Sequence, residues 1–323
     1  MSNTSTNEQA VAAKKPFPKK IIIPTVAASL TITLGIAAGF FAAKMFKGAA
    51  GINYGDVDVG KLTDDLEVSK AKLDRARASG TPLEIALKPS EMVNLAFANY
   101  KELPSAKAIG LGAAVSMGVK QEIQSIQIKD GSRYFEESNS LGLVNLYDRM
   151  YQEGDTTTCY WGESLNYSKN TAKKYTNEEY AEFMGRKVSD PLIYVVSAKT
   201  AITKEEKVRS DRGPSKITKQ DYGYLVDLEL NPKTSVVNYV KQMQNISGLT
   251  GYPTFYHCHL TFRFDENLMP IEYTSYEKYN ATKASVPLPV DIEAYLTTRF
   301  FTTGAYEIPK LTDSTQIEYA NIQ

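Results

Sequence analysis

The chain has 323 residues, and its 37 basic residues balance its 37 acidic residues. Six lysines and only Glu8 fall in the first 47 positions, which leaves 31 basic and 36 acidic residues beyond them, a net charge of −5. A mildly acidic domain without a basic stripe lacks the electrostatic footprint of a nucleic-acid-binding protein. Two cysteines are too few for a disulfide-dense secreted domain or a cysteine-rich zinc site.

An apolar segment near the N-terminus predicts a transmembrane helix. Residues 1–20 are polar and without periodicity, and we expect them to form a disordered cytoplasmic tail. The stretch from Ile21 to Ala43 contains 23 residues and no charge. As a helix rising about 1.5 Å per residue it reaches roughly 35 Å, enough to cross a bilayer. Four lysines precede it and two follow it, so positive charge places the N-terminus in the cytoplasm and the main domain outside.

The competing interpretation of this segment is a cleaved signal peptide, whose apolar region is normally about 7 to 15 residues long. Residues 48–50 (Gly-Ala-Ala) could form a cleavage site, but they lie behind Lys44 and Lys47. The length of the segment and this position favour an uncleaved anchor. We therefore predict a single-pass protein of the cell membrane.

Small residues recur along the predicted span. Gly35 and Gly39 form a GxxxG pair, which would let two membrane helices approach closely. The pair predicts a homodimer contact through the membrane helix. The alternative is that these glycines reflect only the general abundance of small residues in membrane spans.

Two helices are expected after the span. Residues 62–78 are charged and begin near the capping residues Thr63 and Asp64, and we assign residues 44–88 to a helical stalk or linker. Residues 89–104 carry apolar side chains at helical spacing between two prolines, which predicts an amphipathic helix. Residues 89–323 then form one extracytoplasmic domain.

The pattern changes from helical spacing to alternation after Pro104. Between Ile109 and Val119 apolar residues alternate with small ones, which predicts a long strand with one apolar and one nearly bare face. Asp130-Gly131 between two strand-like segments is a hairpin signal. Further strand-like runs occupy residues 145–152, 156–161, 192–197, 222–230, 255–264, 271–279 and 292–301.

Few helices interrupt these strands. A short one begins at a capping box, Thr176 with Glu179, and ends at Gly185, and a longer one covers residues 233–246. Strands joined mostly by turns favour an antiparallel sheet over a doubly wound one. The predicted class is α+β, an antiparallel sheet with a few packed helices, preceded by one transmembrane helix.

Common catalytic and cofactor motifs are missing from the sequence. It contains no G-x-S-x-G, no H-E-x-x-H and no paired C-x-x-C. Residues 55–61 have the spacing of a phosphate loop, but Leu62 stands where the magnesium-binding Ser or Thr is required. We therefore predict a protein that is not an enzyme and needs no cofactor, with an enzyme as the third interpretation.

The two histidines, His257 and His259, are the only ones in the chain. In a strand both point to one face, and two imidazoles at that spacing could begin a metal site. Thr261 and Arg263 share this face, which has the character of a solvent-facing surface with a repelling cation, so we predict no metal site. The opposite face is core or cavity wall and carries Tyr256, Cys258, Leu260, Phe262 and Phe264.

The cysteines are predicted to point inward, since Cys159 shares a face with Trp161. Outside the cytoplasm, a disulfide between Cys159 and Cys258 would stabilise the fold by roughly 4 to 5 kcal/mol on the chain-entropy model. Two buried free thiols are an equally weighted alternative.

The order of elements from about residue 89 to residue 301 resembles the LolA-like lipoprotein-carrier superfamily of bacterial envelopes, which includes mycobacterial lipid-binding lipoproteins. The segments that carry it are the early helix, the glycine-rich strand, IQSIQIKDGSRYFEES, YGYLVDLEL and LTFRFDENLMPIEYTSYEKY. The resemblance implies a strongly curved antiparallel sheet that encloses an apolar cavity for acyl chains. The chain departs from this family in its anchor, because one span replaces a lipobox or cleaved signal.

The predicted function is non-catalytic binding of a lipid or another apolar ligand. The expected wall residues are Trp161, Tyr224, Val226, Leu228, Tyr256, Leu260 and Phe262. The alternative is an envelope interaction or assembly module that acts through protein contacts. A large apolar cavity would favour the first, and a filled core with an exposed aromatic patch would favour the second.

Overall fold

The structure is a computed structural model that describes residues 46–47, 65–116, 118–142, 145–184, 197–210, 217–230, 254–283 and 289–311. The predicted span at 21–43, with Gly35 and Gly39, and the predicted helix at 233–246 lie outside these residues. None of the helices in the described ranges is long and apolar enough to cross a membrane.

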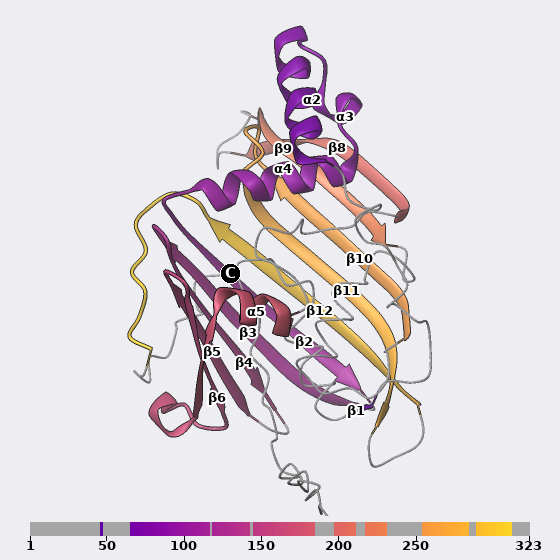
Figure 1. The fold of residues 1–323 in the computed structure, drawn as a ribbon. Helices are drawn as coiled ribbons and strands as arrows, with labels where there is room; N and C mark the ends of the chain where they lie inside the picture. The colour runs from indigo at the N-terminus through magenta and orange to yellow at the C-terminus, as the bar shows by residue number, and fades with distance from the viewer. Residues whose placement is uncertain are drawn as a thin grey trace, which may run out of the picture.

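The described strands form one large, curved antiparallel sheet (Figure 1). Its first half is a meander in which each strand pairs with the next along the chain. The strands of this half are β2 (Ser105–Ser116), β3 (Val119–Asp130), β4 (Arg133–Leu141), β5 (Leu146–Glu153), β6 (Thr156–Gly162) and β7 (Thr171–Thr176).

The second half is also a meander, and β12 pairs with β2 so that the two halves become one sheet. Its strands are β8 (Ser197–Ser210), β9 (Ile217–Leu230), β10 (Thr254–Phe264), β11 (Pro270–Lys283) and β12 (Pro289–Phe301). The short β1 (Phe46–Lys47) pairs with the end of β11, which makes 12 strands in the described part of the chain. The α+β class with a large antiparallel sheet is therefore confirmed.

Turn residues explain the tight connections in the first half. The predicted hairpin at Asp130-Gly131 joins β3 to β4, and Asp130 pairs with Arg133 across it. Gly131 and Gly154 have φ of 60° and 57°, a region that glycine enters without steric cost. These turns fix the register of β3 on β4 and of β5 on β6.

The described helices are α2 (Leu66–Ser79), α3 (Leu83–Ala86), α4 (Pro89–Glu102) and α5 (Asn177–Met184), with a 3-10 turn at Tyr167–Lys169. α4 crosses one end of the sheet, α2 and α3 stand beyond it, and α5 lies in front of the central strands (Figure 1). The predicted capping box is present, because Glu179 N–H donates to Thr176 Oγ1 and Thr176 N–H donates to Glu179 Oε2.

The sheet has an inner face, which carries α4, and an outer face. On β2 the small residues Ala106, Ala108 and Ala114 are in the core with α4, whereas Ile109 belongs to a separate core on the outer face. That outer core is covered by the last residue of β12 and by residues after it: Ile109, Ile126, Ile128 and Phe135 pack with Phe301, Tyr306, Ile308 and Leu311. The bare side of the predicted strand therefore faces the interior.

The inner core centres on Phe97 of α4. Its ring lies 5.8 Å from the Phe262 ring and 5.8 Å from the Phe300 ring, and Phe264 is 6.2 Å away. Edge-on aromatic pairs contribute about 0.5–1.5 kcal/mol each beyond the burial of their area. Phe97 thus packs α4 against both β10 and β12, the two strands that flank β11 in the sheet.

Candidate functional site

Most of the predicted wall residues lie on the inner face and are buried. The register pairs Leu260 with Leu228 and Phe262 with Val226, so β9 and β10 present a continuous apolar surface. Trp161 on β6 is buried in the same apolar cluster, and Tyr224 is partly buried and packs against it. Contact of these residues with a ligand remains a prediction.

Tyr256 is the exception, because it is 55% exposed. The register of β10 against β11 shifts between Phe255 and His257, and this bulge places Phe255 in the core instead. The strict alternation that put Tyr256 on the face of Cys258 was wrong at this position. Phe255 takes the inward position that was expected for Tyr256, and its ring lies 4.9 Å from that of Tyr279.

The inner face also carries a buried acidic group on β4 and β5. Glu136 and Asp148 are 2% and 8% exposed. Burial, and then the nearby Asp148 carboxylate, raise the pKa of Glu136 well above its usual value. Gln127 Nε2 donates to Glu136 Oε2 at 3.4 Å. The arrangement favours a neutral Glu136 carboxyl, which can donate a hydrogen bond.

Several buried polar atoms on and around the inner face have no hydrogen-bond partner in the described part of the chain. A buried polar atom without a partner costs about 1–3 kcal/mol, so each calls for an explanation such as a ligand or a water. These atoms are Tyr134 Oη, Trp161 Nε1, Ser275 Oγ, Tyr279 Oη and both side-chain amide atoms of Asn94.

The two tyrosines in this set are protonated donors. Burial is the main reason that the pKa of Tyr134 lies well above its ordinary value. Burial, and then Glu277, likewise raise the pKa of Tyr279. Indole N–H groups can only donate. The interior therefore combines an aromatic wall with hydrogen-bond donors.

A half-open cavity of about 290 Å³ lies between α2, α3 and the middle of β9. This volume is at the lower limit of the roughly 300–1,000 Å³ of small-molecule sites. Gly223 has φ 114°, and a Cβ there would approach Asp265 Cα to 2.8 Å, so only glycine lets these backbones meet. The lining consists of Ala76, Arg77, Gly80, Thr81, Pro82, Leu83, Gly223, Tyr224 and Glu266.

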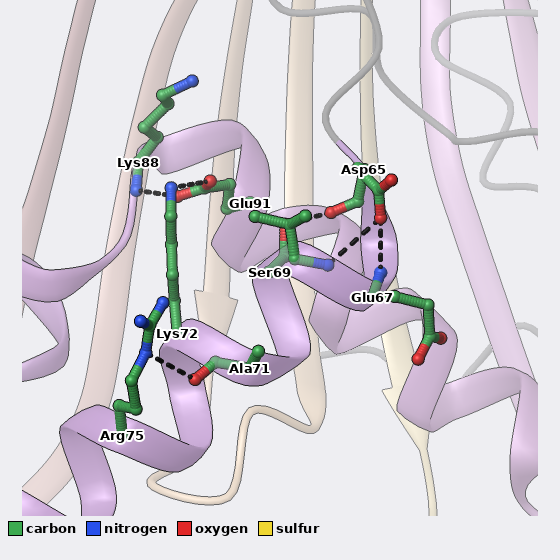
Figure 2. A network of polar contacts seen from close by, with 9 residues as sticks. Asp65, Glu67, Ser69, Ala71, Lys72, Arg75, Lys88 and Glu91 are labelled. Atoms are coloured by element: carbon green, nitrogen blue, oxygen red, sulfur yellow. Dashed lines mark hydrogen bonds and ion pairs between the residues drawn. The ribbon is translucent and has the colours of Figure 1, made fainter.

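A polar network holds α2 on α4 (Figure 2). Because Ala76 and Arg77 of α2 line the cavity, this network also positions one of its walls. Lys72 Nζ forms an ion pair with Glu91 Oε1, and the backbone N–H of Lys88 donates to Glu91 Oε2 at 2.8 Å. Asp65 caps α2 by accepting from the N–H groups of Glu67 and Val68. Within the segment predicted to be a stalk, α2 thus packs on the domain through Leu73 and Ala76.

Both cysteines are buried free thiols, which is one of the two alternatives left open by the sequence. Cys159 is on β6 and Cys258 on β10, and six strands separate them in the sheet order. Burial is the main cause that raises the pKa of each thiol. Thiols of this kind are unreactive at neutral pH.

The histidines lie on the outer face, as the alternation predicted, but their surroundings differ from the expectation. Glu229 pairs with His259 across β9 and β10, and Asp227 contacts His259 as well. Sequence reasoning missed these two acids because it considered β10 alone. The alternation in YLVDLEL, which puts Asp227 and Glu229 on one face, was the available signal.

No family model and no curated protein matches the chain. The structure is similar to that of LprF from Mycobacterium bovis, with a TM-score of 0.35 and 9% identity over 70% of this chain and 97% of that one. It is also similar to a DUF1329 family protein from Desulfovibrio piger, with a TM-score of 0.20 and 7% identity over 66% of this chain and 90% of that one. Both resemblances are distant.

Proposed function

We propose that the inner face of the sheet binds an amphipathic small molecule, such as a lipid, without converting it. The observation that carries the proposal is the set of buried donors, Tyr134, Trp161 and Tyr279, that lack partners in the described ranges although they border a large apolar core. A purely apolar ligand would leave these donors unsatisfied. The polar part of an amphipathic ligand would offer acceptor atoms to the donors at one end of the sheet, and its apolar part would lie against the aromatic wall.

The charges on the inner face narrow the chemistry of the polar part. Tyrosine hydroxyls and an indole N–H donate, so they suit ester, hydroxyl or ether oxygens. The Asp148 carboxylate lies on the same face and disfavours an anionic group beside it, whereas the neutral Glu136 carboxyl can donate a hydrogen bond. The proposed ligand therefore has an uncharged, oxygen-rich polar part and an apolar part.

Placement in the membrane is part of the proposal. Residues 21–43 would anchor the chain, with residues 1–20 in the cytoplasm and the sheet outside, and Gly35 and Gly39 would form the homodimer contact. The support is the uncharged length of the segment and the lysines before it. A tethered binding protein would present or hold its ligand at one membrane rather than carry it between two.

The second candidate function is an interaction module, which exposed tyrosines on the sheet favour. Tyr276 pairs with Tyr295 across β11 and β12, and both are exposed on the outer face. Tyr256 at the bulge is exposed too. Tyrosine is enriched in protein interfaces because it joins a large apolar ring to a hydrogen-bonding group.

Native mass spectrometry of the full-length chain, purified from host membranes and then extracted with solvent, tests the main proposal. We expect a copurifying amphiphile. Tyr134→Phe and Tyr279→Phe are tested separately, because the strand register places these residues at opposite ends of the sheet. The variant that loses a hydrogen bond to the ligand should bind it about 3- to 10-fold more weakly. Tyr256→Phe is the matched control and should bind like the original chain. A chain without a bound amphiphile that also fails to bind an apolar fluorescent probe would leave the interaction module ahead.

A further inference from the structure

The outer face of β9 and β10 brings together three side chains of the kinds that bind transition metals. His257 and His259 alternate with the buried Cys258, so both imidazoles lie on the same side of β10. The antiparallel register places Glu229 of β9 directly opposite His259. Neighbouring strands fix these three positions, and no loop contributes to the group.

The distances within this group suit one shared ion. His257 Nδ1 lies 2.6 Å from Glu229 Oε1, and His259 Nδ1 lies 3.5 Å from Glu229 Oε2. One ligand atom from each of the three residues lies within 4.8 Å of the others. Tetrahedral zinc with bonds near 2.0–2.1 Å keeps its ligand atoms about 3.3 Å apart, so small side-chain rotations would complete the site.

Asp227 supplies a supporting contact. Its Oδ1 contacts Nε2 of His259, the ring nitrogen on the other side from Glu229. Metal-binding histidines commonly donate this second N–H to a carboxylate, which fixes the tautomer and turns the other nitrogen toward the metal. In this arrangement Nδ1 of His259 is the metal ligand and Asp227 positions the ring.

The charges around the group do not oppose a cation. Arg263 shares the face, but it lies 3.3 Å from Glu272, which also binds Arg299. Lys278, opposite His257 on β11, forms an ion pair with Glu293 at 2.6 Å. The repulsion that the sequence suggested for Arg263 is thus offset by an acid, while Glu229 and Asp227 add negative charge at the histidines.

The exposure of the group leaves room for a further ligand. The side chains of His257, His259 and Glu229 are 36%, 38% and 24% exposed. Three protein ligands with access to solvent is the arrangement of an open zinc site, in which water or another molecule takes the fourth position. Two imidazoles and one carboxylate favour zinc and similar metals over calcium or magnesium, which prefer oxygen ligands.

We propose that His257, His259 and Glu229 bind a divalent transition metal ion of the zinc class, with Asp227 positioning His259. The competing explanation is that these groups form only histidine–carboxylate ion pairs. The two explanations differ in whether one equivalent of metal binds and in which residues that binding requires.

Isothermal titration calorimetry of the full-length protein with Zn²⁺ alone distinguishes the metal site from the ion-pair explanation. We expect one equivalent to bind, and His257→Gln with His259→Gln to weaken binding by more than about 100-fold. Asp227→Asn should weaken it by about 10- to 100-fold. Glu122→Gln, which removes an exposed acid from distant β3, is the control and should bind as the original chain does. Ca²⁺ should not bind the group.

A second measurement on the unaltered chain guards against variants that fail to fold. Diethyl pyrocarbonate modifies accessible histidines, and this chain has only two. We expect Zn²⁺ to protect both from modification, as measured by mass spectrometry. Absence of an equivalent of bound zinc, equal binding by the double-histidine variant, or unprotected histidines at saturating zinc would each overturn the proposal.

Discussion

Arg149 and Glu137 form a buried ion pair on the outer face of the sheet, with Arg149 Nε 2.6 Å from Glu137 Oε2 and side-chain exposures of 0% and 3%. The Arg149 guanidinium also lies 3.8 Å from the centre of the Tyr167 ring. It donates to the carbonyl oxygens of Lys310 and Leu311 at 3.3 Å and 3.0 Å. One side chain thus links β4, β5 and the segment that covers the outer core.

Replacing Arg149 by Met should destabilise the protein strongly, because the Glu137 carboxylate would remain buried without its counter-charge. The expected loss in the free energy of unfolding is about 3–5 kcal/mol, measured by urea denaturation. Arg133→Met is the control, because its ion pair with Asp130 is at the surface, and it should leave the midpoint almost unchanged. Equal effects of the two changes would contradict a structural role for the buried pair.

The stability of the protein should depend on pH through Glu136. Since burial raises the folded-state pKa of this carboxyl, the folded protein keeps the proton to a higher pH than the unfolded chain does. Its contribution is therefore complete below the usual pKa near 4.3 and is lost as pH rises through the raised value. Urea unfolding at pH 5 and pH 8 should show Glu136→Gln gaining stability over the original chain toward pH 8. The exposed Glu122→Gln should show no such trend.

The two glycines of β2 should differ in their tolerance of a side chain. A Cβ on Gly112 would come within 2.8 Å of Leu296 Cα, which is backbone and cannot rotate away. A Cβ on Gly110 would meet the hydroxyls of Ser125 and Thr298, which can turn aside. Gly112→Ala should therefore cost about 1–3 kcal/mol in the free energy of unfolding and Gly110→Ala less. A larger loss for Gly110→Ala would contradict this account of the β2–β12 pairing.

Alternation of apolar and polar residues in the sequence predicted which residues of β10 point inward, but it did not predict irregularities in strand pairing. It predicted the inward positions of Cys258, Leu260 and Phe262, because one buried face imposes a period of two. It could not reveal the bulge between Phe255 and His257, since an inserted residue leaves no mark on composition. Tyr256 was misplaced for that reason alone.

The sequence also could not show which side of each strand faces the interior of the domain. On β2 the sequence showed one apolar and one bare side, but the apolar Ile109 faces outward because the residues after β12 cover it. Likewise, Glu229 and His259 are 30 positions apart and meet only through the register of β9 on β10. Long-range pairing of this kind follows from topology, which a pattern along one strand does not contain.

Attachment of α2 to α4 should depend on Lys72. Lys72→Ala would leave the buried Glu91 with the backbone N–H of Lys88 but without its cation, a loss of about 1–3 kcal/mol for this local contact. Hydrogen exchange should then speed up in α2 while the sheet stays protected. Lys70→Ala is the control, because its partner Glu67 is exposed, and exchange in α2 should change little. Unchanged exchange in both variants would mean that apolar packing alone holds α2.

Two hydroxyls on the inner face, one on β11 and one on β12, should respond oppositely to removal. Ser275 Oγ is buried and has no partner in the part of the chain that the structure describes, so Ser275→Ala should raise the free energy of unfolding by about 1 kcal/mol. Thr298 hydrogen-bonds to Tyr273, so Thr298→Val should lower it by about 1–3 kcal/mol. Urea denaturation of ligand-free protein measures both. If an amphiphile accepts a hydrogen bond from Ser275, adding it should reverse the advantage of the alanine variant, whereas an unchanged ranking with ligand bound would show that the ligand does not bond to Ser275.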